Sequence, residues 1–203
     1  MAGRSRTIIL ALTAIVLLVV AGGLYAWSPE KPPAVLAGAV TIGGPFKLTT
    51  QDGKPLSDAD LKGKPFAVFF GFTHCPEVCP TTLWEMTEAL KTLGPDADRL
   101  KVLFISVDPT RDTPEFLARY LQSFDKRIVG LTGTEAEIDA VGKSYRAYWE
   151  KIPLDGGDYT MNHTASIFLM DAKGQFAGTI SYGEAMDMRL GKLRKLIAGG
   201  AVS

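Results

Sequence analysis

The residues best suited to redox or metal chemistry are the only two cysteines of the chain, Cys75 and Cys79. They follow an apolar run over 65–72 that is typical of a buried strand. Pro80 disfavours helical angles at Cys79 and suits the first position of a helix, so we expect a turn over 75–79 and a helix that begins at Pro80. The unpaired N–H groups at the start of a helix favour thiolate over thiol. Both sulfurs are therefore candidates for ionisation near neutral pH, and their spacing lets them converge on one point.

Such a cysteine pair is a redox couple, a metal site or both. A purely structural disulfide is the weaker interpretation, because closing a loop of only a few residues removes little entropy from the unfolded chain. The sequence contains no further cysteine with which to build a disulfide framework. The pair is therefore expected to carry chemistry.

A third metal donor is expected from late in the sequence, at His163. It lies in the segment 159–164, just before a predicted hairpin. In a thioredoxin-like arrangement this segment passes beside the cysteine turn, and two thiolates and one imidazole then converge. A lone histidine at the surface or at the edge of the core is the alternative interpretation.

The donor types favour copper at Cys75, Cys79 and His163. Thiolates are soft ligands that suit Cu(I), and two sulfurs with one nitrogen complete a three-coordinate site for it. Structural zinc normally requires a fourth protein ligand, which the sequence does not offer, whereas catalytic zinc bound by two cysteines, one histidine and water is an alternative. An iron–sulfur cluster is not expected with so few cysteines.

Other polar residues lie close to these in sequence. His74 is expected to be a local electrostatic or contact residue rather than a fourth ligand, because it shares a tight turn with Cys75. Asp108 and Asp112, with Arg111 between them, follow the second core strand at the edge where open α/β sheets bind ligands. Turn and capping chemistry is their simpler interpretation, and contact with a partner or tuning of the site is the alternative.

The elements that must position these residues follow from periodicity and turn signals. A hairpin with an Asp-Gly turn is expected over 46–56, ahead of the strand at 65–72. The helical spacing of Leu83, Met86, Leu90 and Leu93 predicts a helix from Pro80 that ends at Gly94. A run over 100–107 that is apolar apart from Lys101 and Ser106 then predicts a second strand buried on both faces, which completes a βαβ unit.

The second half of the chain continues the alternation. The expected elements are a helix from Pro114 to Leu121 capped by Thr113, a short strand over 128–131, a helix from the capping box at Thr134 to Tyr148, a loop over 151–158 with two glycines and a proline, a hairpin over 165–182 and a helix over 188–197. This order predicts an α/β protein of the thioredoxin-like fold, with a mixed sheet flanked by helices and a cysteine turn after the first core strand.

The N-terminal segment is expected to be a membrane anchor. Residues 7–27 contain no charged residue and span about 30 Å as a helix, the thickness of a bilayer's hydrocarbon core. Arg4 and Arg6 precede this run, which predicts that residues 1–6 are cytoplasmic. A cleaved signal peptide is the alternative. We expect a single-pass protein of the bacterial inner membrane, with a tether over 28–40 and a domain over 41–203 in the periplasm.

The charge balance excludes one class of partner. The chain has 22 basic and 22 acidic residues and a formal net charge of zero. It also lacks a basic stripe interleaved with aromatic residues, so no nucleic-acid binding is expected.

Four segments together resemble the Sco/SenC family: Gly71 to Thr81, Ser106 to Pro114, Gly130 to Gly133 and Asn162 to Thr164. The match covers about residues 40–198, in the family's order. The resemblance implies a thioredoxin-like fold, one N-terminal membrane helix and one copper per chain, Cu(I) or Cu(II), held by Cys75, Cys79 and His163. It also implies a role in the assembly of cytochrome c oxidase, by delivering copper to the dinuclear site of subunit II or by first reducing the cysteines of that site. The expected partners are subunit II and an upstream protein that donates copper.

One position departs from the family pattern. An acidic residue is expected just before the ligand histidine, and this chain has Asn162. The loss of a nearby negative charge makes the imidazole less basic and leaves open a weaker preference for Cu(II).

Two other functions use the same cysteines. One is a membrane-tethered thiol–disulfide reductase with Cys75 and Cys79 as its catalytic redox pair, and the other is a thiol peroxidase with Cys75 as its peroxidatic residue. Three residues separate the cysteines here, whereas thioredoxin-type oxidoreductases have two, and neither activity needs His163. We therefore expect a copper metallochaperone rather than an enzyme, with the reductase as the alternative.

Overall fold

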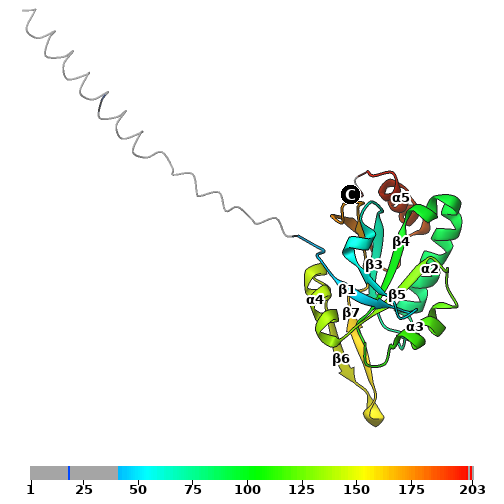
Figure 1. Ribbon diagram of the computed structural model, residues 1–203, viewed down its shortest axis with the longest axis vertical. Coiled ribbons are helices and arrows are strands. Elements are labelled where there is room, and N and C mark those ends of the chain that lie inside the picture. Colours follow the sequence, from blue (N-terminus) through cyan, green and yellow to red (C-terminus); the bar gives the residue numbers. More distant parts are fainter. Residues whose placement is uncertain (1–17, 19–40, 201, 203) are drawn as a thin grey trace, which may run out of the picture. The chain divides into compact units, whose positions relative to one another are not determined.

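The structure, a computed structural model, describes Leu18, residues 41–200 and Val202 (Figure 1). The predicted anchor and tether therefore lie outside the described residues, apart from Leu18. Within the described part of the chain, no helix combines the length and the apolar character needed to cross a bilayer. From Thr41 onward the described residues belong to one structural unit.

A mixed sheet lies at the centre of this unit. Within residues 41–200 it has seven strands, in the order β2-β1-β5-β4-β3-β8-β9. The strands are β1 (Lys47–Thr50), β2 (Pro55–Ser57), β3 (Phe66–Gly71), β4 (Lys101–Ser106), β5 (Ile128–Thr132), β8 (Ile167–Met170) and β9 (Phe176–Ile180). β3, β4 and β5 are parallel, and β8 runs antiparallel beside β3. Every residue of β3 is buried, as its continuous apolar run predicts for a strand covered on both faces.

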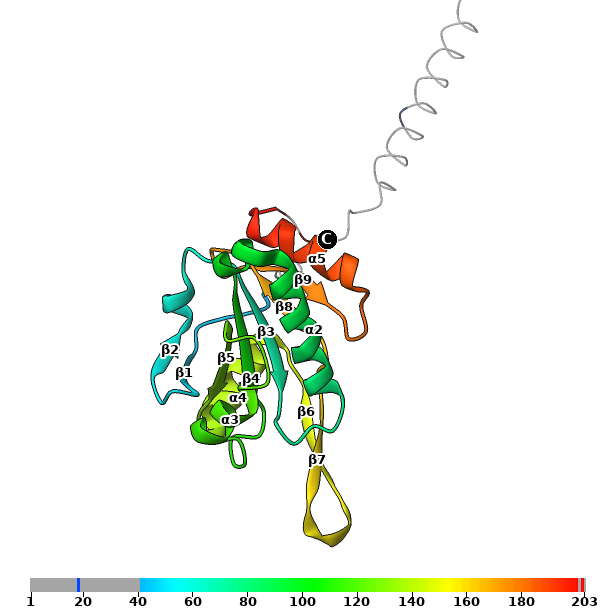
Figure 2. The same ribbon diagram turned by 90° about the vertical axis from the view of Figure 1, so that its right-hand side faces the viewer.

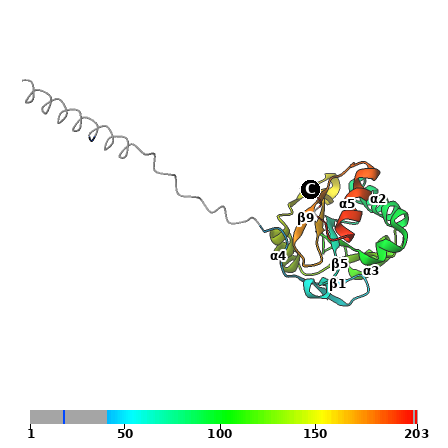
Figure 3. The same ribbon diagram turned by 90° about the horizontal axis from the view of Figure 1, so that it is seen from above.

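Helices cover both faces of the sheet. α2 (Val78–Leu93) and α3 (Pro114–Leu121) each connect neighbouring parallel strands, and right-handed crossovers place them on the same face. α5 (Met186–Ile197) packs against α2, and α4 (Glu135–Tyr145) lies on the opposite face (Figures 1 and 3). The predicted mixed sheet flanked by helices, with the cysteine turn after the first core strand, is confirmed.

The start of α2 differs from the prediction. The helix begins at Val78 rather than Pro80, so Cys79 lies in its first turn. Pro80 fits this position because the first N–H groups of a helix have no partner within the helix, and proline removes only such a group. The second sulfur is therefore fixed by helical geometry rather than by a turn.

The end of α4 is also earlier than predicted. The capping box at Thr134 and Glu137 is present, but the helix ends at Tyr145 rather than at Tyr148. Arg146 adopts left-handed angles, with φ of 54°, and donates its backbone N–H back into the last turn. The chain therefore turns early enough for Tyr148 to lead into a strand.

The predicted loop over 151–158 is wrong for residues 151–153, which belong to a strand, whereas residues 154–158 connect the two strands of a ribbon. β6 (Trp149–Pro153) pairs antiparallel with β7 (Tyr159–His163), and the ribbon projects from the body of the protein (Figure 2). Gly156 and Gly157 form its tip, both at positive φ (85° and 86°). Most of β6 is exposed, so no alternation of apolar and polar residues marks it as a strand.

Backbone hydrogen bonds fix which groups of the ribbon face outward. Leu154 donates to the carbonyl of Asp158 at 2.8 Å, and Thr164 donates to the carbonyl of Tyr148 at 2.9 Å. In an antiparallel pair, hydrogen-bonded and non-bonded positions alternate, so the even-numbered residues of β7 are those bonded to β6. The backbone N–H and C=O groups that point away from β6 are those of Tyr159, Met161 and His163.

Candidate metal centre

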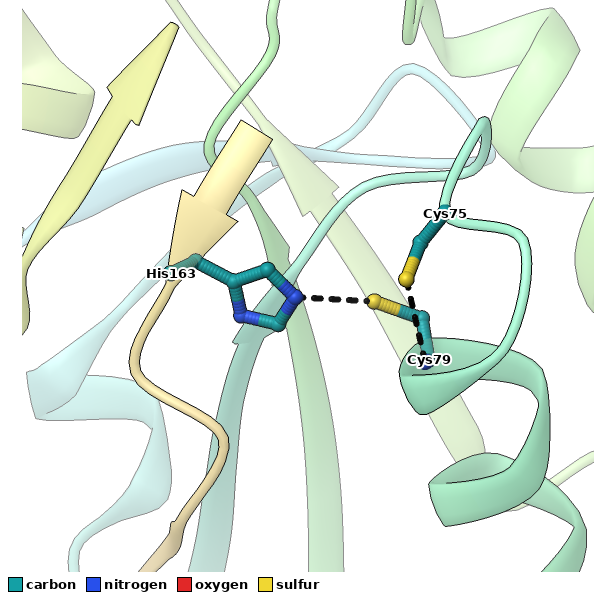
Figure 4. A group of neighbouring side chains, drawn as sticks. All are labelled: Cys75, Cys79 and His163. Carbon is teal, nitrogen blue, oxygen red and sulfur yellow. Dashed lines mark hydrogen bonds between the residues drawn. The ribbon is translucent and has the colours of Figure 1, made fainter. Parts of the chain in front are cut away.

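Three donor atoms from distant parts of the chain meet at one end of β3. Among the described residues, Cys75, Cys79 and His163 form the one group of three side chains whose donor types and spacing allow them to hold a metal ion, and their donor atoms all lie within 4.8 Å of one another (Figure 4). His163 Nε2 lies 3.4 Å from Cys79 Sγ, although 84 positions separate the two residues. An ion held in a trigonal site at about 2.3 Å from sulfur and about 2.0 Å from nitrogen has donors about 4 Å apart. The observed spacing fits such a site.

The junction between β3 and α2 positions both cysteines. The backbone N–H of Cys79, in the first turn of α2, donates to Cys75 Sγ at 3.4 Å. The backbone N–H of Cys75 donates to the carbonyl of Phe72 at 3.3 Å and so closes the turn against the end of β3. A helix N-terminus therefore directs an N–H group at a sulfur, as the sequence predicts.

The two thiols differ strongly in their acidity. Cys75 is half-buried, whereas Cys79 is fully buried. A hydrogen bond from the Cys79 thiol lowers the pKa of Cys75 to about 3, and His163 and nearby N–H groups act in the same direction. Burial raises the pKa of Cys79 above its ordinary value, and the thiolate of Cys75 adds to this effect. Both sulfurs are candidates for ionisation from the sequence, but in the metal-free chain burial opposes ionisation of Cys79.

His163 is oriented with its free nitrogen towards the thiols. Its Nδ1 lies 3.0 Å from the carbonyl oxygen of Thr164, which accepts and cannot donate, so Nδ1 carries the proton. Nε2 then presents a lone pair on the side of Cys79. The ring packs edge-on against Phe69 and Phe72, at centroid distances of 6.0 and 5.7 Å. A carbonyl and two aromatic rings thus hold the imidazole as a metal donor.

Asp112 fixes the segment that leads into the cysteine turn through buried hydrogen bonds. Its fully buried carboxylate accepts from the backbone N–H of Thr73 at 3.0 Å and from the hydroxyls of Thr73 and Ser106, both at 2.6 Å. Burial raises the pKa of Asp112, and the hydrogen bonds from Ser106 and Thr73 oppose that rise. Thr73 precedes Cys75 by two positions. Asp112 therefore supports the site rather than capping α3, which is the role of Thr113.

Asp108 holds the ribbon that carries His163. Its buried carboxylate accepts from Arg111 Nε and from the hydroxyl of Tyr159, the latter at 2.8 Å. Arg111 also donates to the carbonyl of Tyr159 at 2.9 Å, and its guanidinium lies over the Tyr159 ring, 3.7 Å from the ring centre. Tyr159 lies at the far end of β7 from His163. Asp108 and Arg111 thus attach the ribbon to the loop between β4 and α3.

His74 lies outside the donor group. Its ring stacks on Phe116 at a centroid distance of 5.2 Å, and Nδ1 lies 3.1 Å from the hydroxyl of Thr73. It does not belong to the group of converging donors in the described residues. The structure therefore gives His74 the local contact role that its position in the turn predicts.

Two supporting residues, Thr73 and Tyr159, were not predicted from the sequence. Thr73 acts through a carboxylate 39 positions away, and Tyr159 through one 51 positions away. The one available signal was Arg111 between two aspartates, which suggested a role for that loop but did not identify the residues that it contacts.

Fold and site together define a thioredoxin-like protein whose cysteine pair is completed by a distant histidine. The family model described as SCO1/SenC matches residues 35–198. The chain therefore belongs to the SCO1/SenC family.

Relatives and solved structures agree with this assignment. A structure described as Bradyrhizobium japonicum ScoI with copper bound is 50% identical, has a TM-score of 0.72, and the match covers 76% of this chain and 99% of that one. Saccharomyces cerevisiae "Protein SCO2, mitochondrial" is 38% identical over 198 residues, which are 90% of this chain and 65% of the relative. BsSco, described as a member of the Sco family of cytochrome c oxidase assembly proteins with a disulfide switch, is 26% identical with a TM-score of 0.62, over 78% of this chain and 94% of that one. The chain spans less than two thirds of the length of the yeast relative.

Proposed function

We propose that this protein binds one copper ion through Cys75, Cys79 and His163 and acts in the assembly of cytochrome c oxidase. The observation that carries the proposal is the convergence of two sulfurs and one nitrogen within 4.8 Å. Two soft sulfur donors favour copper over harder metal ions. The copper-bound relative, which matches over nearly its whole length, supports the choice of metal.

The acceptor in this proposal is the dinuclear copper site of cytochrome c oxidase subunit II, and an upstream protein supplies the copper. Cys75 is half-buried, whereas Cys79 is enclosed, so Cys75 is the ligand through which copper exchanges with another protein. Ligand exchange keeps the soft ion bound to sulfur throughout the transfer. The membership of BsSco in a family of oxidase assembly proteins supports this role.

The proposed location is the bacterial inner membrane, with residues 7–27 as a single anchor and the copper-binding domain in the periplasm. The uncharged run over 7–27 and the preceding Arg4 and Arg6 support this orientation. Residues 28–40 then act as a tether that keeps the site near the membrane surface.

The unequal acidity of the two thiols favours a second function, reduction of the cysteines of the copper site in subunit II. The Cys75 thiolate attacks one sulfur of the target disulfide, forms a mixed disulfide and releases the other sulfur as a thiolate. Cys79 then gives up its proton and attacks Cys75, which releases the second target sulfur and leaves a disulfide between Cys75 and Cys79. The target gains two electrons, and a thiol reductant must restore the pair.

A copper titration of the reduced full chain tests the first function. One equivalent should bind tightly to the wild type, and His163→Ala should lose tight binding while both thiols stay oxidisable. His74→Ala is the matched control, because the only other histidine lies outside the donor group and should leave binding unchanged. One tightly held copper in the His163→Ala variant contradicts the three-donor site, and undiminished reduction of an oxidised subunit II fragment by that variant favours the second function.

A further inference from the structure

A strand position is open beside the metal-binding residues. β3 pairs with β8 in a register that places Phe69 opposite Ile167, and the same register continued would place Thr73 opposite His163. The chain instead leaves the sheet after Gly71 and forms the cysteine turn. In the part of the chain that the structure describes, β7 therefore has β6 on one side and no strand on the other.

The open edge of β7 carries unpaired backbone groups. Met161 and His163 direct their N–H and C=O groups away from β6, and no residue among 41–200 forms a backbone hydrogen bond with them. At Tyr159 the same edge is already in use, because the carbonyl accepts from Arg111. The ladder positions from Met161 to His163 are thus free to bind another backbone.

A groove of about 260 Å³ runs along this edge. One wall is formed by the cysteine turn and the first residue of α2, over 75–78, and the other by residues 160–163 of β7. Glu77 gives the groove an acidic side chain, and no lysine or arginine lines it. His163 belongs both to the edge and to the donor group, and Cys75 lines the groove, so the groove gives direct access to the Cys75 sulfur.

We infer that this groove binds an extended, cysteine-bearing segment of the polypeptide that exchanges copper or electrons with this site, and that the segment adds to β7 as a strand. The inference rests on the proposed function and names how its partner docks. Hydrogen bonds to Met161 and His163 recognise the backbone of the segment whatever its side chains are, and they place its cysteine beside Cys75. A lysine or arginine next to that cysteine complements the charge of Glu77.

A chemical trap measures this recognition in the full chain. The variant Cys79→Ser is mixed with a synthetic Lys-Val-Cys-Val-Thr peptide whose cysteine is a mixed disulfide with thionitrobenzoate. The Cys75 thiolate attacks the peptide sulfur, the bond to thionitrobenzoate breaks, and the coloured thiolate leaves with the electron pair. The rate of colour release reports how well the peptide is positioned.

Methylation of peptide nitrogens supplies matched controls. Methyl groups on one alternate set of residues remove the N–H groups that face β7 and should slow the reaction roughly tenfold, whereas methyl groups on the other set should leave the rate unchanged. Replacing the peptide lysine by glutamate should also slow it. Equal rates for both methylated sets overturn strand addition.

Amide hydrogen exchange in the trapped product supplies an independent readout. Exchange at Met161 and His163 should slow roughly tenfold, while Thr160 and Asn162, which already bond to β6, should not change. Unchanged exchange at Met161 and His163 overturns the inference. Copper titration of the wild type separates this inference from the proposed function. If copper binds but exchange does not slow at alternate residues of β7, strand addition alone is overturned. If exchange slows at alternate residues but copper does not bind, the copper carrier is overturned and strand addition is supported.

Discussion

The hydroxyl of Tyr159 donates a 2.8 Å hydrogen bond to the buried carboxylate of Asp108 and so joins the ribbon that carries His163 to the loop between β4 and α3. Asp112, in the same loop, binds Thr73 at the start of the cysteine turn. One loop that supplies no metal donor therefore sets the relative position of the cysteine and histidine donors. Its residues are expected to control the affinity of the site.

Substituting Tyr159→Phe should weaken copper binding. The change removes a hydrogen bond to a charged group, which contributes about 1.5–3 kcal/mol, so the affinity for Cu(I) should fall roughly ten- to hundredfold. Competition with a chelator of known affinity measures the loss. Tyr148→Phe is the matched control, because the Tyr148 hydroxyl donates an exposed hydrogen bond to Glu150, a residue of the same ribbon. An equal loss in both variants would show that Asp108 does not position His163.

Substituting Asp112→Asn should change how stability depends on pH. Burial raises the pKa of Asp112, so the folded state holds the proton more tightly than the unfolded chain does. Folding stability therefore falls as the pH rises from the ordinary aspartate value towards the raised one, and the asparagine variant should lack this fall. Urea unfolding from about pH 3.5 to 7 measures the difference.

The companion variant Asp112→Ala separates charge from hydrogen bonding. It leaves the buried groups of Thr73 and Ser106 without an acceptor and should cost about 3 kcal/mol at neutral pH. Asparagine keeps one acceptor oxygen, so the Asp112→Asn variant should lose only about 1 kcal/mol of stability at neutral pH. Similar costs for both variants would contradict the role assigned to these hydrogen bonds.

Alkylation of the reduced, metal-free chain should be selective for Cys75. With the pKa of Cys75 held at about 3, iodoacetamide should react at this residue nearly as fast at mildly acidic as at neutral pH, and burial should protect Cys79. Peptide mass spectrometry locates the label. The Cys79→Ser variant lacks the thiol that stabilises the Cys75 thiolate most, so alkylation of Cys75 in this variant should slow as the pH is lowered. Preferential labelling of Cys79 would contradict the assigned environments.

Substituting Gly71→Ala should disturb the site without touching a donor. A Cβ at this position would lie 2.7 Å from Cys79 Sγ and 2.7 Å from a ring carbon of Phe104, so the sulfur or the strand must shift. We expect a loss of about 1–3 kcal/mol in stability and weaker copper binding. Gly191→Ala, in α5 with nothing within 4 Å of the added Cβ, is the control and should stabilise the protein by up to about 1 kcal/mol. Unchanged copper affinity in Gly71→Ala would contradict the close contact.

The core elements were predictable because each has a strong local signal. β3 is a continuous apolar run and β4 is apolar between Lys101 and Ser106. α3 carries Thr113 and Pro114 at its start, and the capping box at Thr134 begins α4. Periodicity and capping act over a few residues, so the sequence shows them directly.

The ribbon was not predictable in this way, because most of β6 faces solvent and its tip contains the residues of an ordinary loop. The weak acidity of Cys79 was not predictable in this way either. The dipole of α2 is a local property, whereas burial of Cys79 depends on how the whole sheet packs. The convergence of Cys79 and His163 was predictable only through the fold, since no local pattern relates residues 84 positions apart.

The separation of the donors couples metal binding to folding. In the unfolded chain the two thiols are neighbours, but the imidazole is 84 positions from Cys79 and loop closure is needed to bring it near. A ligand that requires all three donors therefore binds the native state alone and raises the melting temperature in proportion to the logarithm of its free concentration. The finished domain, rather than the nascent polypeptide, is the species that acquires such an ion.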